Sequence, residues 1–292
     1  MNNASQVEKI NFPMQVNFVS KGTGAPVVMI HGLSASLHDW DFLMPELVKA
    51  GFSGYALDLL GHVESPKPEV RRYRMDWLFE HFLFWLEGMH LEQRAVLIGH
   101  SLGGYLALEY AYLYPDRISG LILVDPFYSL DQLPAFMRFT YRHPMLSGFV
   151  AHNTPEWLYR AIIDISSLSI SHSAGGLHAL PREVRAQTAL DYTRTAAGVY
   201  NILNAKLDLT SNLATITMPC MVIWGDRDQT LAPDSFEKLV NILPNAIGRS
   251  IRAGHVPHQS NADWFNELVL KFLASIGEST NLVNNTSSLR SS

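Results

Sequence analysis

The chain has 292 residues, of which 47% are hydrophobic and 17% are charged, with a formal charge of −5 at pH 7. This composition suits a large buried core, and the low fraction of charged residues argues against a disordered chain. The lack of a long basic run argues against nucleic acid as a main partner. The amino terminus lacks the cationic start and apolar stretch of a signal peptide, and no apolar run approaches about 18 residues. We therefore expect a cytoplasmic protein with no membrane span.

Short apolar runs alternate with helical patterns along the chain, which predicts an α/β fold with a mostly parallel sheet. An early strand is expected within residues 14–24, ending in a glycine turn. Buried parallel strands are expected at 26–32, 53–59, 94–100, 119–125, 219–226 and 248–255. Apolar residues at helical spacing predict helices at 73–89, 102–114, 234–242 and 260–276.

One region departs from this alternation. Residues 127–212 contain amphipathic segments and no strand-like run, so we interpret them as a helical cap over the carboxyl ends of the strands. Residues 1–126 and 213–276 would then form the α/β core. The polar, aperiodic tail 277–292 is predicted to be disordered.

The single cysteine, Cys220, lies in an apolar strand, so it is expected to be a small core residue and no internal disulfide can form.

The segment Gly-His-Ser-Leu-Gly at 99–103 joins a predicted strand to a predicted helix and matches the pattern G-x-S-x-G. In a nucleophile elbow, a serine occupies a sharp turn between strand and helix, and small residues are needed on both sides because neighbouring elements pass very close. The helix also directs its amino end towards developing negative charge. Ser101 is therefore a candidate nucleophile, against the alternative of a polar residue in a glycine-rich turn.

A serine hydroxyl is a weak nucleophile until a base accepts its proton, so a histidine and an orienting carboxylate are needed. Asp226 and Asp228 follow the strand at 219–226, and His255 follows the strand at 248–255. Open α/β sheets bind ligands at these carboxyl ends. The sequence therefore predicts that Ser101, an acid and a histidine meet at one edge of the sheet.

The ordered motifs HGLSAS, DLLGHVES, GHSLGG, WGDRD and AGH resemble those of the α/β-hydrolase fold, in particular serine carboxylesterases and lipases with a helical cap. The resemblance spans residues 14–276. It implies that Ser101 is the nucleophile, that Asp228 is the acid by the pattern G-x-x-D from Gly225, and that His255 is the base.

The resemblance also implies an oxyanion hole made by the backbone amides of Leu33 and Leu102. Asp226 is then expected to brace its loop, Asp125 remains an alternative acid after its strand, and His258 is expected to support or pack the His255 loop. No cofactor and no metal site are expected, because no further ligand cluster accompanies His255 and His258.

The segment 58–65 departs from the family form D-x-P-G-x-G-x-S, since Leu60 replaces the proline and Val63 replaces the second glycine. If that position requires a positive φ, valine is strained there or the loop takes another path. His31 is expected to fix the oxyanion loop by hydrogen bonds, His62 to be structural, and His100 to pack within the elbow.

The predicted cap is rich in large apolar residues, which favour an uncharged, moderately hydrophobic small-molecule substrate. They are Phe127, Tyr128, Phe136, Met137, Phe139, Tyr141, Met145, Phe149, Trp157 and Tyr159. The favoured activity is carboxylic ester hydrolysis. Two alternatives are hydrolysis of a carbon–carbon bond in a ring-fission dienone, and a ligand-binding receptor or inactive relative on the same fold. The sequence does not predict an oligomeric state.

Overall fold

The computed structural model describes residues 13–134, 153–158, 160–162, 164–165, 180–204 and 208–288. Its centre is a seven-stranded sheet with strand order β1-β3-β2-β4-β5-β6-β7. The strands are β1 (Phe18–Lys21), β2 (Pro26–Ile30), β3 (Ser53–Leu57), β4 (Ala95–His100), β5 (Ile118–Val124), β6 (Cys220–Gly225) and β7 (Ala246–Ile251). β1 pairs antiparallel with β3, and every other neighbouring pair is parallel. The α/β class and the six parallel strands predicted from the sequence are confirmed, but β7, at the edge of the sheet, is half-exposed where a buried strand was expected.

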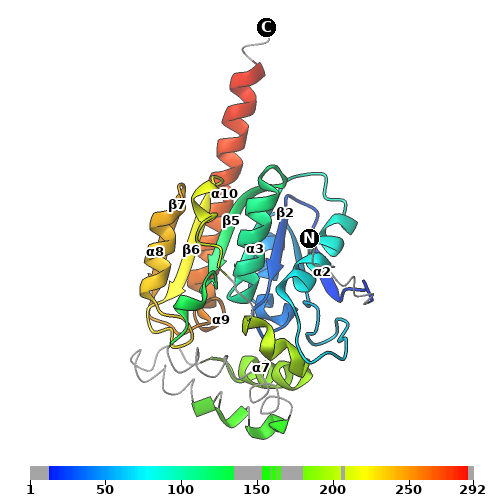
Figure 1. The fold of residues 1–292 in the computed structure, drawn as a ribbon. Coiled ribbons are helices and arrows are strands. Elements are labelled where there is room, and N and C mark those ends of the chain that lie inside the picture. Colours follow the sequence, from blue (N-terminus) through cyan, green and yellow to red (C-terminus); the bar gives the residue numbers. More distant parts are fainter. Residues whose placement is uncertain are drawn as a thin grey trace, which may run out of the picture.

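Helices cover both faces of this sheet (Figure 1). One face packs against α2 (Met75–Gly88), α3 (Leu102–Leu113) and α8 (Asp234–Ile242), and the other packs against α1 (Met44–Lys49) and α10 (Ala262–Ser288). The four predicted helices are all present. The short helix α1 was not predicted, because its six residues are too few for a helical period to stand out.

The strands supply apolar side chains to both layers, as expected for parallel strands buried on both faces. On β2, Val28 and Ile30 pack against the α2–α3–α8 layer, whereas Val27 and Met29 pack against the α1–α10 layer. All four side chains are fully buried. Since a buried valine, isoleucine or methionine contributes about 1.5–3 kcal/mol, this rigid centre holds the strand ends in place.

Part of the predicted cap lies across the carboxyl ends of the strands. Helix α7 (Arg182–Arg194) and the 3-10 segment η4 (Ala197–Asn204) lie at the same end of the molecule as α9 (Pro257–Ser260) (Figure 1). The Ser36 hydroxyl donates a hydrogen bond to Asp191 of α7 over 2.6 Å, and Ala196 N–H donates to the Gly61 carbonyl over 2.8 Å. The boundaries of core and cap stay a prediction.

The carboxyl-terminal segment differs from its prediction. Residues 277–288 continue α10 as helix to Ser288, beyond the sheet, where a disordered tail was expected (Figure 1). No proline follows Pro257, so nothing in the backbone forces the helix to end once its apolar face has packed. Among the described residues, no helix has the length and apolar character needed to cross a bilayer.

Candidate active site

Ser101 occupies the turn between β4 and α3. Its φ of 49° lies in the left-handed region, which is strained for a side chain other than glycine. The turn needs glycine at Gly99 and Gly103, because a Cβ at these positions would lie 2.4 Å from the Gly103 oxygen and 2.2 Å from the Ile30 oxygen, respectively. Both glycines therefore permit the close approach that the elbow pattern predicted, and the serine side chain is raised above the strand end.

His255 lies between Ser101 and Asp228. The Ser101 hydroxyl donates a hydrogen bond to His255 Nε2 over 2.9 Å, and His255 Nδ1–H donates to Asp228 Oδ2 over 2.7 Å. The Asp228 side chain is fully buried, whereas the His255 side chain keeps about a fifth of its surface exposed. The three residues named from the sequence are thus brought together in the order serine, histidine, carboxylate.

The carboxylate of Asp228 is held on both oxygens. Its Oδ1 accepts hydrogen bonds from the backbone amides of Thr230 (2.7 Å) and Leu231 (3.1 Å), so Oδ2 is left to face the imidazole. Asp226 lies apart from His255, with about half of its side chain exposed beside Arg227. The structure therefore brings Asp228 and not Asp226 to the histidine.

Asp125 is buried beside this carboxylate. Its Oδ1 accepts the Gly225 N–H over 3.0 Å, and its Oδ2 has no hydrogen-bond partner. Burial and the neighbouring charge of Asp228 raise the pKa of Asp125 well above its usual range. Since the hydrogen bond from His255 Nδ1–H goes to Asp228 Oδ2, the geometry favours Asp228 over Asp125 as the acid.

The loop after β2 carries one of the two predicted oxyanion amides. His31 bridges this loop to the segment at 58–65, because its Nδ1–H donates to the Gly32 carbonyl over 2.7 Å and its Nε2 accepts the Leu59 amide over 2.9 Å. Leu102 is the first residue of α3, so its N–H has no partner within that helix. Leu33 and Leu102 both line the cavity that contains Ser101.

At 58–65, where the sequence departs from the family form, valine takes the place of the second glycine with a positive φ. Val63 has a φ of 35° and is almost fully buried, so it occupies the conformation that glycine would adopt without strain. Gly61 also has a positive φ, of 84°. His62 is buried and its Nδ1–H donates to the Leu60 carbonyl over 3.1 Å. Burial lowers the pKa of His62 to about 3, which agrees with a structural and uncharged role.

The cavity at Ser101 is small and mostly apolar. It has a volume of about 260 Å³, and its walls include Leu33, Leu102, Phe127, Leu133 and Leu231. Two tyrosines of the predicted cap, Tyr192 and Tyr200, also line it. Among the residues that line it, the groups that can carry charge are His100, His255 and the tyrosine hydroxyls. An uncharged apolar group fits this lining, because it would leave no buried charge unpaired.

A match over most of the sequence shows which family the chain belongs to. Residues 25–262 match the family model described as the alpha/beta hydrolase fold, and this match covers more than half of the sequence. The chain belongs to the alpha/beta hydrolase fold family.

Known alpha/beta hydrolases resemble the chain over most of its length. Lipase 3 of Moraxella sp. (strain TA144) is 26% identical over 80% of this chain and 73% of that protein. A pimeloyl-[acyl-carrier protein] methyl ester esterase of Aeromonas salmonicida is 26% identical over 89% of this chain and its own full length. The structure of a thermophilic esterase from Thermogutta terrifontis superposes with a TM-score of 0.74 at 22% identity, covering 89% of this chain and 93% of that one. At this identity the structural likeness shows the fold.

Some residues of this alpha/beta hydrolase site were not predicted. Tyr192 and Tyr200 were not singled out, because only the packing of α7 and η4 over the strand ends brings them to the cavity. Trp157, which was expected to contribute to an apolar pocket, is 69% exposed and is absent from the lining of the Ser101 cavity. The predicted pocket residues outside the described part of the chain are Phe136, Met137, Phe139, Tyr141, Met145, Phe149 and Tyr159.

In the described part of the alpha/beta hydrolase, each of two side-chain clusters brings three metal-ligating atoms within 4.8 Å of one another. They are Asp39–His100–His258 and Asp125–Asp228–His255. In both groups a histidine is hydrogen-bonded to an aspartate, at 3.2 Å from His100 to Asp39 and at 2.7 Å from His255 to Asp228. Carboxylate–imidazole contacts account for both clusters, so neither geometry requires a metal.

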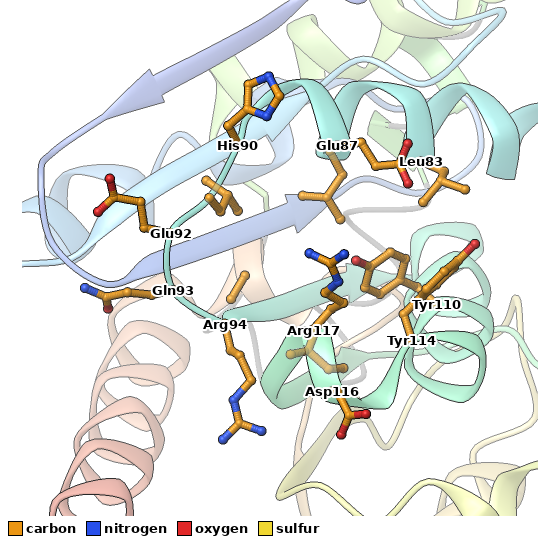
Figure 2. Close-up of a pocket in the computed structure, with 14 residues that line it drawn as sticks. Leu83, Glu87, His90, Glu92, Gln93, Arg94, Tyr110, Tyr114, Asp116 and Arg117 are labelled. Atoms are coloured by element: carbon orange, nitrogen blue, oxygen red, sulfur yellow. The ribbon is translucent and has the colours of Figure 1, made fainter.

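A second cleft lies away from Ser101, at the opposite end of the sheet. Figure 2 shows it, with a volume of about 560 Å³, between the end of α2 and the start of β4. Arg94 and Arg117 line it together with Glu87, Glu92 and Asp116. Because this lining carries both signs of charge, it favours neither an anionic nor a cationic ligand.

Proposed function

We propose that this alpha/beta hydrolase is a serine carboxylesterase that cleaves esters of small to medium, uncharged hydrophobic substrates through an acyl-enzyme intermediate. The observation that carries the proposal is the continuous contact from Ser101 Oγ to His255 Nε2 at 2.9 Å and from His255 Nδ1 to Asp228 Oδ2 at 2.7 Å. Two hydrogen bonds in this order are what activation of a serine by a general base requires.

Acylation begins when Ser101 Oγ attacks the ester carbonyl carbon as its proton passes to His255 Nε2. The buried carboxylate of Asp228 stabilises the imidazolium that forms and keeps the Nδ1 proton directed towards itself. His255 then gives its proton to the leaving alcohol as the bond between the carbonyl carbon and the alcohol oxygen breaks. The acyl group remains on Ser101.

The negative oxygen of the tetrahedral intermediate is assigned to the amides of Leu33 and Leu102. Both are backbone donors, so a leucine side chain is compatible with the role at each position. Such donors act on charge that develops only in the transition state, and removal of one donor typically costs about 2.7–4 kcal/mol. The amino end of α3 adds a favourable field at the same point.

Deacylation uses the same residues in reverse. A water molecule gives a proton to His255 Nε2 and attacks the acyl carbon, and the imidazolium then returns the proton to Ser101 Oγ as the acid leaves. The cavity volume of about 260 Å³ is at the small end for ligand sites, which favours short or medium acyl groups.

The test is steady-state hydrolysis of p-nitrophenyl esters from acetate to palmitate, with Ser101→Ala as the matched control. We expect multiple turnovers that are greatest for short or medium acyl chains and that are abolished in Ser101→Ala, while the thermal unfolding midpoint is preserved. Activity retained in Ser101→Ala would contradict the assignment of the nucleophile.

The two alternatives drawn from the sequence stay predictions, and the same assay separates them. Absence of turnover on every ester, together with cleavage of a coloured ring-fission dienone, would favour the carbon–carbon hydrolase. A single-turnover burst without further turnover would favour a receptor, because a receptor retains its ligand after one covalent step.

A further inference from the structure

A second buried polar cluster lies directly behind the proposed catalytic residues and is formed by Asp39, His100, His258 and Gln259. His100 is the residue immediately before Ser101, and only about 4% of its surface is exposed. Its Nε2 lies 2.9 Å from the backbone carbonyl oxygen of His255, and its Nδ1 lies 3.2 Å from Asp39 Oδ2. The proposed mechanism uses none of these contacts.

The two acceptors around His100 determine where its protons lie. A carbonyl oxygen can only accept, so Nε2 must carry a hydrogen. Burial alone would raise the pKa of Asp39, but hydrogen bonds and charge from His100 and His258 outweigh burial and hold this pKa well below its usual range. Asp39 Oδ2 faces the other ring nitrogen, Nδ1, at 3.2 Å, so both nitrogens of His100 are held by fixed partners.

The ring of His100 also contacts both of the loops that flank Ser101. A Cβ added to Gly32, in the oxyanion loop, would lie 2.8 Å from His100 Nδ1, so the ring packs directly on that loop. The rings of His100 and His255 have centroids 5.1 Å apart. One side chain thus contacts the oxyanion loop and the His255 loop, while its backbone is joined to the nucleophile.

We propose that His100, held by Asp39, is a positioning residue that fixes the His255 loop and the oxyanion loop relative to Ser101. The proposal rests on the proposed esterase function and adds to it the residue that sets the geometry of the site. Gln259 supports the pair, because its side-chain amide donates to Asp39 Oδ1 over 3.0 Å. A misplacement of about 1 Å in reacting groups can cost about 100-fold in rate, so such a residue affects kcat through the groups that it positions.

The other titratable groups around His100 come from three elements. His31 follows β2, His255 precedes α9, His258 lies in α9, and Asp39 lies in η1 (Leu37–Trp40). Burial and the charge of His100 lower the pKa of His258 to about 4, so His258 is neutral near pH 7. Asp39 is therefore the one carboxylate among these groups, and it contacts His100 Nδ1 at 3.2 Å.

The kinetic test compares His100→Ala, His100→Gln and His81→Ala with the parent chain on p-nitrophenyl acetate. We expect His100→Ala to lower kcat about 10- to 100-fold with KM changed less than about threefold. His100→Gln keeps one N–H for the His255 carbonyl and should recover at least several-fold over His100→Ala. His81 is the matched control, because it is a fully buried histidine on α2 whose Nε2 contacts the Gln15 carbonyl, away from Ser101.

The separate effects on kcat and KM in a variant of Asp39 add a measurement that loss of stability alone would not change. In Asp39→Asn the carboxylate that holds His100 Nδ1 is replaced by an amide, so kcat should fall about 10-fold with KM changed less than about threefold, while the unfolding midpoint changes little. Equal effects of His100→Ala and His81→Ala on kcat, or an unchanged kcat in Asp39→Asn, would overturn the proposal.

A spectroscopic measurement keeps this inference separate from the esterase proposal. With ¹⁵N-labelled histidine, and with His100→Gln to assign the signal, His100 should carry a hydrogen-bonded proton on Nε2 in the parent chain, and the ring signals should shift in Asp39→Asn. This result is expected even if no ester is hydrolysed, which would refute only the proposed function. An Nε2 of His100 without a proton in the parent chain would refute the positioning role.

Discussion

Replacement of Asp228 by asparagine tests the order of the proposed site most directly. Asp228 Oδ1 accepts two backbone amides, from Thr230 and Leu231, and Oδ2 faces His255. In Asp228→Asn, the amide oxygen must stay with the two backbone N–H groups, because the side-chain NH₂ group cannot accept from them. The NH₂ group is therefore turned towards His255 Nδ1.

The consequence is a change of tautomer at His255. With a donor facing Nδ1, that nitrogen becomes an acceptor and the ring proton moves to Nε2, which then cannot accept the Ser101 proton. A wrong tautomer of this kind costs about 10⁴-fold in kcat. This factor corresponds to about 5 kcal/mol of transition-state stabilisation, at about 1.36 kcal/mol for each factor of ten.

The assay is kcat and KM on p-nitrophenyl acetate, with thermal unfolding measured on the same samples. We expect Asp228→Asn to lose about 10⁴-fold in kcat, with a small change in the unfolding midpoint because the amide is nearly isosteric with the carboxylate. The matched control is the half-exposed Asp226, since Asp226→Asn should change kcat by less than about twofold. Activity of Asp228→Asn within tenfold of the parent chain would refute the assigned order.

Three further predictions concern the elbow, the link to α7 and the pocket. Gly103→Ala places a Cβ 2.2 Å from the Ile30 oxygen, so it should destabilise the fold by about 1–3 kcal/mol and lower kcat, as measured by denaturant unfolding and ester hydrolysis. Burial raises the pKa of Asp191 to about 6, so the folded chain keeps this proton to higher pH than the unfolded chain does. The free energy of unfolding should therefore decline as pH rises from about 4 to about 6. Asp191→Asn should flatten that decline in unfolding curves recorded across this range. Tyr200→Ala enlarges the Ser101 cavity and should move the preferred p-nitrophenyl ester to a longer acyl chain, whereas Trp157→Ala, on a 69% exposed side chain, should leave the preference unchanged.

The sheet could be predicted from the sequence because its strands are short runs of apolar residues buried on both faces. Val27 to Ile30 and Leu121 to Val124 are fully buried, so the local composition reflects the environment directly. The elbow could be predicted for a steric reason, since Gly99 and Gly103 have no space for a side chain. The orientation of β1 could not be predicted, because strand pairing depends on residues distant in the sequence.

The residues around the proposed catalytic centre were harder to predict. His100 was expected to pack within the elbow, but its ring nitrogens contact two partners outside it, the His255 carbonyl and Asp39. Its partner Asp39 was not named, because the two residues are 61 positions apart and no local pattern joins them. Tyr192 and Tyr200 were missed for a similar reason, since only the packing of α7 and η4 over the strand ends directs them to the cavity.

The hydrogen bond between Ser101 and His255 joins residues 154 positions apart, and the segment between them includes β5, α7, β6 and β7. Contacts of such long range form late, because the entropy of closing the intervening chain must be overcome first. Refolding and chain synthesis would therefore pass through species with much of the sheet formed and no competent serine. In a time course of refolding, the return of ester hydrolysis would report completion of the carboxyl-terminal half and would lag behind the recovery of helical circular dichroism.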